Sequence, residues 1–341
     1  MSLNTQPQEY VELAELNTLR VAAIARYYLE VRDAEELSEA LAWAERQELR
    51  TLILGGGSNL VFYGDFDGLV VRMAMRGRRW EQASGQDATL VLGAGENWHE
   101  AVLYAAGAGY RGIENLALIP GTAGAAPVQN IGAYGVELRD TLVSVTALDR
   151  ETGKVITLER EDCEFAYRDS LFKRTPGRYV IIEIRLRLSR SKPLQLGYRD
   201  LEEYLAGTSP SELTVTDVAT AVMAIRRRKL PDPEMIPNAG SFFKNPVVPS
   251  ADYENLLARY PDMVGYAQSS SVKLAAAWLI DQCGWKGFRN ENVGVHNRQA
   301  LVLINHSGGT GRDILELAAK IRASVQDKFG VELEMEPGIV S

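Results

Sequence analysis

The segment from Gly107 to Gly135 constrains the fold of this chain more than any other part of the sequence. It is rich in glycine, alanine and proline and has few large side chains. Long irregular segments are uncommon inside compact domains, and the ordered ones usually carry a function. Because so little side chain is available to form a core, we expect this segment to be ordered by something that it wraps.

Polar residues are spread among the small ones in the second half of this segment. From Ile119 onward it reads Ile-Pro-Gly-Thr-Ala-Gly-Ala-Ala-Pro-Val-Gln-Asn-Ile-Gly-Ala-Tyr-Gly. Small residues allow the backbone to approach a flat ligand closely, and Thr122, Gln129, Asn130 and Tyr134 can fix its orientation. The residues alone do not decide between a ligand-binding loop and a structural loop packed on a sheet.

A second glycine-rich loop, Gly55-Gly56-Gly57-Ser58-Asn59, follows a short apolar run, Thr51–Leu54, that is typical of a buried strand. Glycines let backbone N–H groups converge on a phosphate, and the serine and asparagine can add donors. The spacing is that of neither a Rossmann fingerprint nor a Walker A loop. A tight turn without a ligand is the alternative.

The overall length and composition predict a globular protein of two or three domains. The chain has 341 residues, of which 46% are hydrophobic, an ordinary share for a protein with a real core. Its net charge of −8 disfavours binding to nucleic acid or to an anionic membrane. The longest apolar run, Leu274–Ile280, is far too short to span a bilayer, and the N-terminus does not read as a signal peptide.

Cysteine and histidine are sparse. Cys163 and Cys283 show no paired spacing, so we expect no disulfide framework and a reducing, cytoplasmic location. The three histidines, His99, His296 and His306, are isolated in the sequence, and we therefore expect no metal site.

Hydrophobic periodicity predicts alternating helices and strands in the first half of the chain. Residues Ala34–Glu48 place four apolar side chains on one helical face: Leu37, Ala40, Leu41 and Ala44. The run Tyr179–Leu188 alternates apolar with charged side chains, as a half-exposed strand does.

A second unit is expected to begin near residue 225. Thr216 is the expected cap of a helix that ends before Pro231. Another helix is predicted over Val272–Gln282, and the pair Thr310 and Asp313 has the capping-box pattern that starts a last helix.

Three short motifs carry side chains suited to chemistry. In Tyr167-Arg168-Asp169-Ser170, the Arg168 guanidinium suits a planar carboxylate, although a surface salt bridge is the commoner fate of such a pair. In Asn238-Ala239-Gly240-Ser241-Phe242-Phe243-Lys244-Asn245-Pro246, Ser241 could donate a proton in a dry pocket or simply satisfy a turn. No G-x-S-x-G elbow is present, which disfavours a hydrolase triad. The cations Arg226-Arg227-Arg228-Lys229 either stabilise a helix C-terminus or neutralise a pyrophosphate.

The segment Val331–Glu336 alternates apolar and acidic residues and is predicted to be the last strand. Alternation places Glu332, Glu334 and Glu336 on one face. Taken alone, the pattern indicates a solvated acidic face.

These motifs, in their fixed order, resemble the UDP-N-acetylenolpyruvoylglucosamine reductase family of bacterial cell-wall synthesis. The resemblance runs from about Ala34 to Glu336, nearly the whole chain, and it includes Lys-Leu-Pro-Asp-Pro at Lys229. The surroundings of Tyr198 are similar to the class with an extra tyrosine-bearing loop over the substrate. Gln268-Ser269-Ser270-Ser271 departs from the Gln-Ala-Asp-Gly that is more usual in the family.

The resemblance implies an α+β fold. It implies an FAD-binding region of the vanillyl-alcohol-oxidase (PCMH) type over residues 1–225, in subdomains of about 1–73 and 74–225. The final strand, 331–341, would return to the first subdomain. A C-terminal α+β substrate-binding domain would span residues 226–330.

The resemblance also implies which residues form the site. It places FAD against the two glycine-rich loops and one helical arginine: Gly55, Gly56, Gly57, Ser58, Asn59, Ile119, Gly121, Thr122, Gly124, Ala125, Gln129, Asn130, Gly132, Ala133, Tyr134 and Arg226. It gives catalytic positions to Arg168, Ser241 and Glu336. It makes substrate contacts of Tyr198, Lys229, Asn245, Tyr266, Lys286 and Gln299.

The implied reaction reduces UDP-N-acetylglucosamine enolpyruvate to UDP-N-acetylmuramate with NADPH, through non-covalent FAD, in a monomer. Hydride would reach the methylene carbon, and Arg168 would stabilise the charge that develops next to the substrate carboxylate. Ser241 would deliver the proton, with Glu336 hydrogen-bonded to the enolate form. Two rivals stay open: an alcohol oxidase or dehydrogenase of the same flavin superfamily, and a nucleotide-binding regulator without turnover.

Overall fold

A computed structural model describes residues 6–341 of the chain. Within it the residues group into two units, each continuous in space but not in sequence. The first contains residues 6–11, Ala25–Gly57 and Asp67–Arg228, and the second contains Glu12–Ile24, Ser58–Phe66 and Lys229–Ser341. The domain boundary expected at residues 225/226 stays a prediction.

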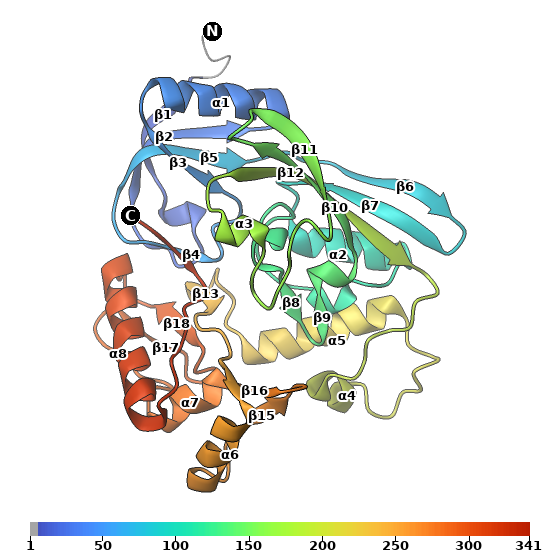
Figure 1. The fold of residues 1–341 in the computed structure, drawn as a ribbon, viewed down its shortest axis with the longest axis vertical. Coiled ribbons are helices and arrows are strands. Elements are labelled where there is room, and N and C mark those ends of the chain that lie inside the picture. Colours follow the sequence, from blue (N-terminus) through green and yellow to red (C-terminus); the bar gives the residue numbers. More distant parts are fainter. Residues whose placement is uncertain (1–5) are drawn as a thin grey trace. The chain divides into compact units, whose positions relative to one another are not determined.

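A four-stranded sheet and one helix begin the first unit. The sheet has the order β1-β2-β5-β3, with strands β1 (Gln8–Glu12), β2 (Ile24–Val31), β5 (Phe66–Met73) and β3 (Arg50–Leu54). Helix α1 (Ala34–Arg46) starts at Asp33, whose carboxylate accepts the N–H groups of Glu35 and Glu36. The predicted apolar face of α1 is confirmed: it is buried in a cluster with strands β2 and β5, and α1 lies along this sheet in Figure 1.

A five-stranded antiparallel sheet forms the centre of the first unit. Its order is β11-β10-β12-β7-β6, with strands β11 (Lys154–Glu159), β10 (Leu142–Asp149), β12 (Tyr179–Ser189), β7 (Asp87–Gly93) and β6 (Arg78–Ser84). Helices α2 (Trp98–Gly107) and α5 (Val215–Lys229) share one hydrophobic cluster with this sheet. The predicted strand over residues 179–188 is confirmed as β12, with Ile184, Leu186 and Leu188 buried.

The glycine-rich segment packs on this same cluster. It contains short 3-10 turns and a small hairpin: η2 (Glu114–Leu116), η3 (Ala126–Gln129), β8 (Gly132–Ala133) and β9 (Val136–Glu137). Its buried side chains, among them Ile113, Leu116 and Ile131, join the core around α2 and α5. Three further short elements follow it: η4 (Leu138–Asp140), α3 (Leu171–Arg174) and α4 (Arg199–Tyr204).

The second unit contains three small sheets. The first has the order β13 (Asn238–Ser241), β18 (Val302–Asn305) and β17 (Val293–Val295). The second has the order β14 (Val247–Pro249), β16 (Ser271–Leu274) and β15 (Gly265–Ala267). The third is the parallel pair β19 (Gly338–Val340) and β4 (Leu60–Phe62). The helical elements are η1 (Ala14–Leu16), α6 (Ser250–Arg259), α7 (Ala276–Gln282) and α8 (Gly311–Phe329).

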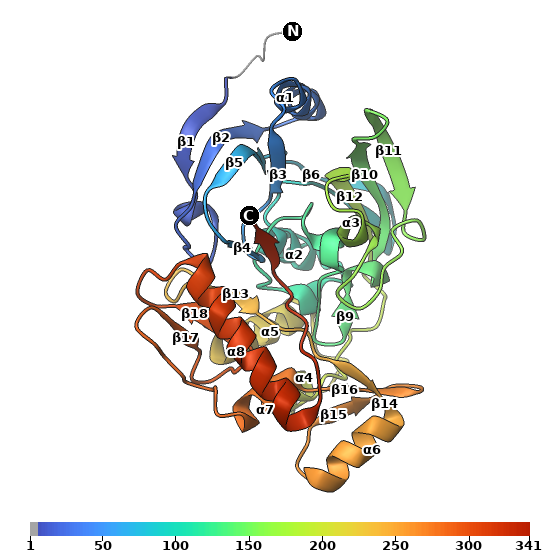
Figure 2. The same cartoon turned by 60° about the vertical axis from the view of Figure 1, so that its left-hand side comes forward.

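Helix α8 starts directly on strand β4. The predicted capping box is confirmed, since the Thr310 hydroxyl accepts the Asp313 N–H and the Asp313 carboxylate accepts the Thr310 N–H. A Cβ atom at Gly311 would lie 1.7 Å from the carbonyl oxygen of Phe62, so only glycine fits. Figure 2 shows β19 running beside β4 in the same unit.

Three predicted elements are wrong in detail. Residues 271–274 form the central strand β16, not the start of a helix, because Val272 and Leu274 alternate into the core and pair with strands on both sides. Thr214, not Thr216, caps α5, where it exchanges hydrogen bonds with Asp217. Residues 331–336 form no ladder; an isolated bridge joins Met335 to Phe243, and the last strand lies at 338–340.

Within residues 6–341, no helix combines the length and the apolar character needed to cross a membrane.

Candidate active site

The glycine turn after β3 lies against the glycine-rich segment. A Cβ atom at Gly56 would be 2.7 Å from the Cα of Gly121, and one at Gly55 would be 2.7 Å from Oγ1 of Thr122. Gly57 has a φ of 61°, in the left-handed region that favours glycine. Glycine is therefore required at Gly56 by the close approach of another backbone, at Gly55 by the Thr122 side chain, and at Gly57 by its own conformation, as expected for a phosphate-binding cradle.

The segment 121–124 is held along the chain that leads into α2. The Gly124 N–H donates to the Ala94 carbonyl (2.9 Å), and the Ala123 N–H donates to the Glu96 carbonyl (2.8 Å). The Trp98 N–H in turn donates to the Gly121 carbonyl (3.1 Å). Backbone hydrogen bonds therefore fix the course of this segment without large side chains.

Among residues 6–341, two buried polar atoms of the predicted cofactor residues have no hydrogen-bond partner: Oγ1 of Thr122 in this cradle, and Nε of Arg226 near Tyr134. Buried polar groups are nearly always paired, so unpaired ones at a predicted site favour a ligand that supplies the partners. Burial lowers the pKa of the Arg226 guanidinium, and the Arg168 charge lowers it further. An anion would relieve both effects, so these residues fit the phosphate and polar ring atoms of FAD.

The turn that carries Arg168 is tied to the same segment. Arg168 has a left-handed φ of 54°, and its Nη2 donates to the Gly132 carbonyl oxygen (2.6 Å). A Cβ atom at Gly132 would lie 2.9 Å from Nη1 of the same guanidinium. Asp169 pairs with Arg174. The structure therefore brings Arg168 and Gly132 together, as the resemblance implies for a catalytic and a cofactor-binding residue.

Asn130 orders the loop with its side chain. It is fully buried with a φ of 45°, and its amide nitrogen donates to Glu137 (3.0 Å) and to the Ala166 carbonyl (3.1 Å). Its amide oxygen accepts the Arg139 N–H (3.1 Å). The Asn130 side chain already makes hydrogen bonds within the chain, so a contact with FAD would have to come from the Asn130 backbone. That contact stays a prediction.

Tyr198 meets Tyr134 in the first unit. The two rings pack edge to face with centroids 5.1 Å apart, and Tyr198, at the start of α4, is 40% exposed. Burial raises the pKa of Tyr134, while the nearby Arg226 charge opposes the shift. A predicted substrate residue and two predicted cofactor residues thus cluster near the C-terminal end of α5.

Ser241 is the last residue of β13 in the second unit. It is half-buried and is followed by the fully buried Phe242 and Phe243. Gly240 adopts a φ of 70° and its N–H is bound by the Asn238 side chain (2.8 Å), which sets the bend before the serine. Among residues 6–341, no hydrogen bond engages the Ser241 hydroxyl, so it can donate to a substrate.

Glu336 lies beside the Ser241 segment. Its N–H donates to the Phe242 carbonyl (2.9 Å), and the Asn59 amide donates to its carbonyl oxygen (3.4 Å). Glu332 and Glu334 are exposed, but Glu336 is partly buried. The structure therefore separates Glu336 from the solvated acidic face and places it with Ser241 and Asn59.

The other predicted substrate residues lie on separate elements of the second unit. The Asn245 side chain accepts the Ala276 N–H at the start of α7 (3.0 Å), and Gln299 accepts the Leu301 N–H (3.3 Å). Lys286 is exposed and paired with Asp281. Tyr266, on β15, is 50% exposed, and Lys229 ends α5. Their role as substrate contacts stays a prediction.

Sequence reasoning missed the anchor formed by residues 94–99. Trp98 donates through Nε1 to the Leu116 carbonyl (3.0 Å), and His99 accepts the Leu118 N–H through Nδ1 (3.1 Å). The available signal was the run Gly93-Ala-Gly-Glu-Asn-Trp98, whose glycines and asparagine are typical of a turn, between the apolar run Thr89–Leu92 and the apolar residues that follow His99.

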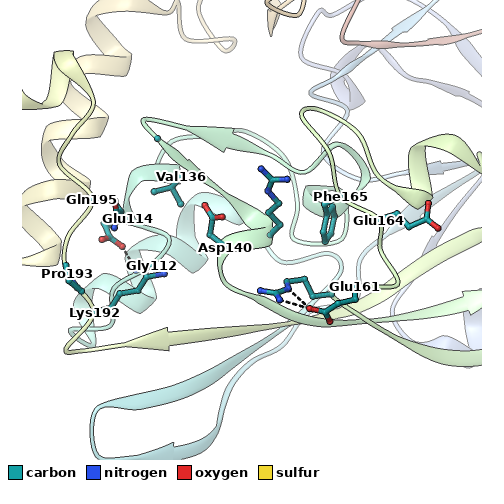
Figure 3. A pocket seen from close by; sticks show the side chains of 13 residues that line it. Gly112, Glu114, Val136, Asp140, Glu161, Glu164, Phe165, Lys192, Pro193 and Gln195 are labelled. Carbon is teal, nitrogen blue, oxygen red and sulfur yellow. Dashed lines mark hydrogen bonds and ion pairs between the residues drawn. The ribbon is translucent and has the colours of Figure 1, made fainter. Parts of the chain in front are cut away.

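A cavity of about 850 Å³ lies elsewhere in the first unit, and none of the predicted site residues lines it. Figure 3 shows Phe165, Asp140 and Glu161 around it, with Glu114 and Lys192 at the opposite end. Several of its charges are already paired within the chain, including Arg160 with Glu161. We therefore assign no part of the predicted site to this cavity.

The glycine cradle makes a direct test possible. We expect Gly56→Ala to lower the free energy of unfolding by about 1–3 kcal/mol and FAD affinity by about tenfold or more, because the new methyl group meets backbone that cannot yield. Gly107→Ala is the matched control, since nothing lies within 4 Å of its added Cβ. Thermal unfolding and FAD titration measure both effects, and equal behaviour of the two variants would contradict the cradle.

Models of two protein families match the chain: an FAD binding domain over residues 25–159, and the C-terminal domain of UDP-N-acetylenolpyruvoylglucosamine reductase over residues 232–340. A UDP-N-acetylenolpyruvoylglucosamine reductase from Pseudomonas putida is 47% identical over 338 residues, covering 99% of this chain and 100% of the relative. The chain belongs to the UDP-N-acetylenolpyruvoylglucosamine reductase family. The same-named protein of Chromobacterium violaceum is 48% identical over 334 residues, 97% of this chain and 98% of its own length.

A solved structure agrees with this membership of the reductase family. The crystal structure of UDP-N-acetylenolpyruvylglucosamine reductase from Thermus caldophilus matches with a TM-score of 0.69 and 25% identity, covering 98% of this chain and 100% of the other. The predicted family, the α+β fold with its FAD-binding region and the oxidoreductase class are confirmed. The chain is an FAD-dependent reductase, so the alcohol oxidase and the regulator without turnover are both wrong.

Proposed function

We propose that this chain reduces the enolpyruvyl group of UDP-N-acetylglucosamine enolpyruvate to give UDP-N-acetylmuramate, with NADPH as reductant, in peptidoglycan precursor synthesis. The observation that carries the proposal is the hydrogen bond from the Glu336 N–H to the carbonyl of Phe242, the residue after Ser241 (2.9 Å), in the part of the chain that matches the family's C-terminal domain. A cytoplasmic location and a monomeric state belong to the proposal.

FAD would supply the redox chemistry when bound, namely the transfer of a hydride from NADPH to the substrate's methylene carbon. Gly55–Gly57, the segment 119–134 and Arg226 are the residues that would hold it. Their backbones are fixed by hydrogen bonds within the chain, so little reorganisation is needed on binding. No histidine or cysteine lies in either glycine-rich loop, which supports non-covalent attachment.

Arg168 stabilises the charge that develops on the substrate. Addition of hydride to the methylene carbon leaves an electron pair on the neighbouring carbon, and this pair delocalises into the attached carboxylate. The bond to the Gly132 carbonyl holds the guanidinium in one place, so its positive charge needs little reorientation to stabilise this carboxylate. Its left-handed backbone is maintained by the bonds of Asn130 to the same turn.

Ser241 completes the reduction by delivering a proton to that neighbouring carbon, which neutralises the electron pair. Its hydroxyl is half-buried beside two buried phenylalanines, where few waters compete for the reaction. Glu336, on the adjoining segment, acts as the neutral acid and donates a hydrogen bond to the enolate form, while Arg168 supplies the countercharge.

A spectroscopic experiment tests this function. The purified protein should be yellow, and acid precipitation should release free flavin into the supernatant. Anaerobic NADPH should bleach the colour, and UDP-N-acetylglucosamine enolpyruvate should restore it. UDP-N-acetylglucosamine, which lacks the enolpyruvyl group, is the control and should restore nothing. A protein that NADPH bleaches but the enolpyruvyl substrate does not reoxidise would refute the proposed reaction.

A further inference from the structure

His99 occupies the first turn of α2, where it contacts the glycine-rich segment just before Ile119. Its Nδ1 atom accepts the N–H of Leu118 at 3.1 Å. The preceding residue, Trp98, donates through Nε1 to the carbonyl of Leu116 at 3.0 Å. Two consecutive side chains therefore hold the three-residue stretch that leads into Ile119.

The backbone needs this support at Leu118. Its φ of 61° lies in the left-handed region, which is unfavourable for a residue with a side chain and persists only where the surroundings impose it. Leu118 immediately precedes Ile119-Pro120-Gly121, and Gly121 is the residue that packs against Gly56. A change of conformation at Leu118 would shift the cradle.

We infer that His99 is a positioning residue for FAD, whose unprotonated Nδ1 fixes the entry of the cofactor-binding loop. This inference rests on the proposed placement of FAD against residues 119–134. His99 acts through Leu118, and no contact of its own with the cofactor is needed. Nothing in the proposed reaction uses His99 as an acid or a base.

The role requires a neutral imidazole, with its proton on Nε2, because a protonated ring has no acceptor at Nδ1. The surroundings favour that form: burial, then the charges of Arg227 and Arg226 on α5, lower the pKa of His99, and Glu100 on α2 opposes them. A histidine whose pKa is lowered on folding stabilises the folded state fully when the pH is above the ordinary histidine pKa of about 6.5. This stabilisation is lost as the pH falls from there through the lowered pKa.

Replacing His99 with alanine and with asparagine distinguishes the effect of losing the hydrogen-bond acceptor from the effect of losing the bulk of the ring. His99→Ala removes the acceptor, whereas the amide oxygen of His99→Asn can take the place of Nδ1. The cost of leaving the Leu118 N–H unpaired should weaken FAD binding by about tenfold for alanine, and by less than about threefold for asparagine. His296 provides the matched control, since its Nδ1 also accepts a backbone N–H, from Arg298 (3.4 Å), in the second unit.

The measurement is a titration of the full-length protein with FAD, followed by flavin fluorescence at about pH 7.5 and about pH 5.5. The parent should lose affinity as the pH falls through the lowered pKa of His99, and His99→Asn should lose less, because an amide does not titrate. His296→Asn should behave like the parent. Equal affinities for His99→Ala and the parent, or equal losses for the alanine and asparagine variants, would overturn the inference.

The failure of this inference is distinguishable from failure of the proposed function. If Gly56→Ala weakens FAD binding but His99→Ala does not, the cofactor placement stands and His99 has no positioning role. If neither variant changes FAD affinity, the placement of FAD on this loop is itself wrong.

Discussion

Replacing Ser241 with alanine is expected to slow the oxidation of the reduced flavin by the enolpyruvyl substrate by roughly 10²–10⁴-fold, the usual contribution of a positioned proton donor. Reduction of the flavin by NADPH should change little, because the serine acts only in the second half of the cycle. Stopped-flow absorbance of the flavin measures each half-reaction separately.

A matched serine exists in the same unit. Ser250 is half-buried and is the first residue of α6, whose N-cap is Pro249. Ser250→Ala should leave both half-reactions unchanged. Equal slowing of the two half-reactions in Ser241→Ala would indicate a distorted pocket rather than a lost proton donor.

The second large effect is expected on the rate of flavin oxidation when Glu336 is replaced. The other two glutamates of the segment 331–336 serve as controls. Glu336→Ala should slow oxidation of the reduced flavin by roughly 10²-fold or more, since a hydrogen-bonding group aimed at developing charge is lost. Glu336→Gln should slow it much less, because the amide keeps the shape and a donor.

Glu332 and Glu334 are the controls in that series. Both glutamates are exposed. Glu332 pairs with Arg322 (3.2 Å), and an exposed pair of this kind contributes about 1 kcal/mol at most to stability. Glu334 pairs with Lys244 (2.5 Å), whose side chain is only 12% exposed, but the Glu334 carboxylate itself faces solvent. Glu332→Ala and Glu334→Ala should therefore turn over substrate like the parent. A Glu336→Ala variant with parental rates would remove Glu336 from the site.

Elements with strong local signals could be predicted from the sequence. Helix α1 follows from the spacing of its apolar residues, and α8 follows from its capping box and from Gly330, which ends it at a φ of 70°. Residues 271–274 could not, because an apolar run of this length suits a helix or a strand equally well. Only the pairing of β16 with a strand on each side decides between them.

The site shows the same limit. The glycine loops are visible in the sequence because close backbone approach demands glycine wherever it occurs. The structural role of Asn130 could not be predicted from the sequence, because its hydrogen-bond partner Ala166 is 36 residues away in the chain. Its left-handed backbone conformation is indicated only by the residue type. His99 reads as an isolated histidine for a similar reason, because its partner at Leu118 is reached across a helix and a loop.

The parallel pairing of β19 with β4 determines how genes of this family can be recombined. A fragment that begins near residue 226 would carry β19 and α8 without residues 60–62, and so would expose an unpaired strand and leave Gly311 without the backbone on which it rests. A chimera with a single crossover at that point would join β4 from one parent to β19 from the other. Exchange of the second unit between relatives therefore calls for transfer of Glu12–Ile24, Ser58–Phe66 and Lys229–Ser341 together.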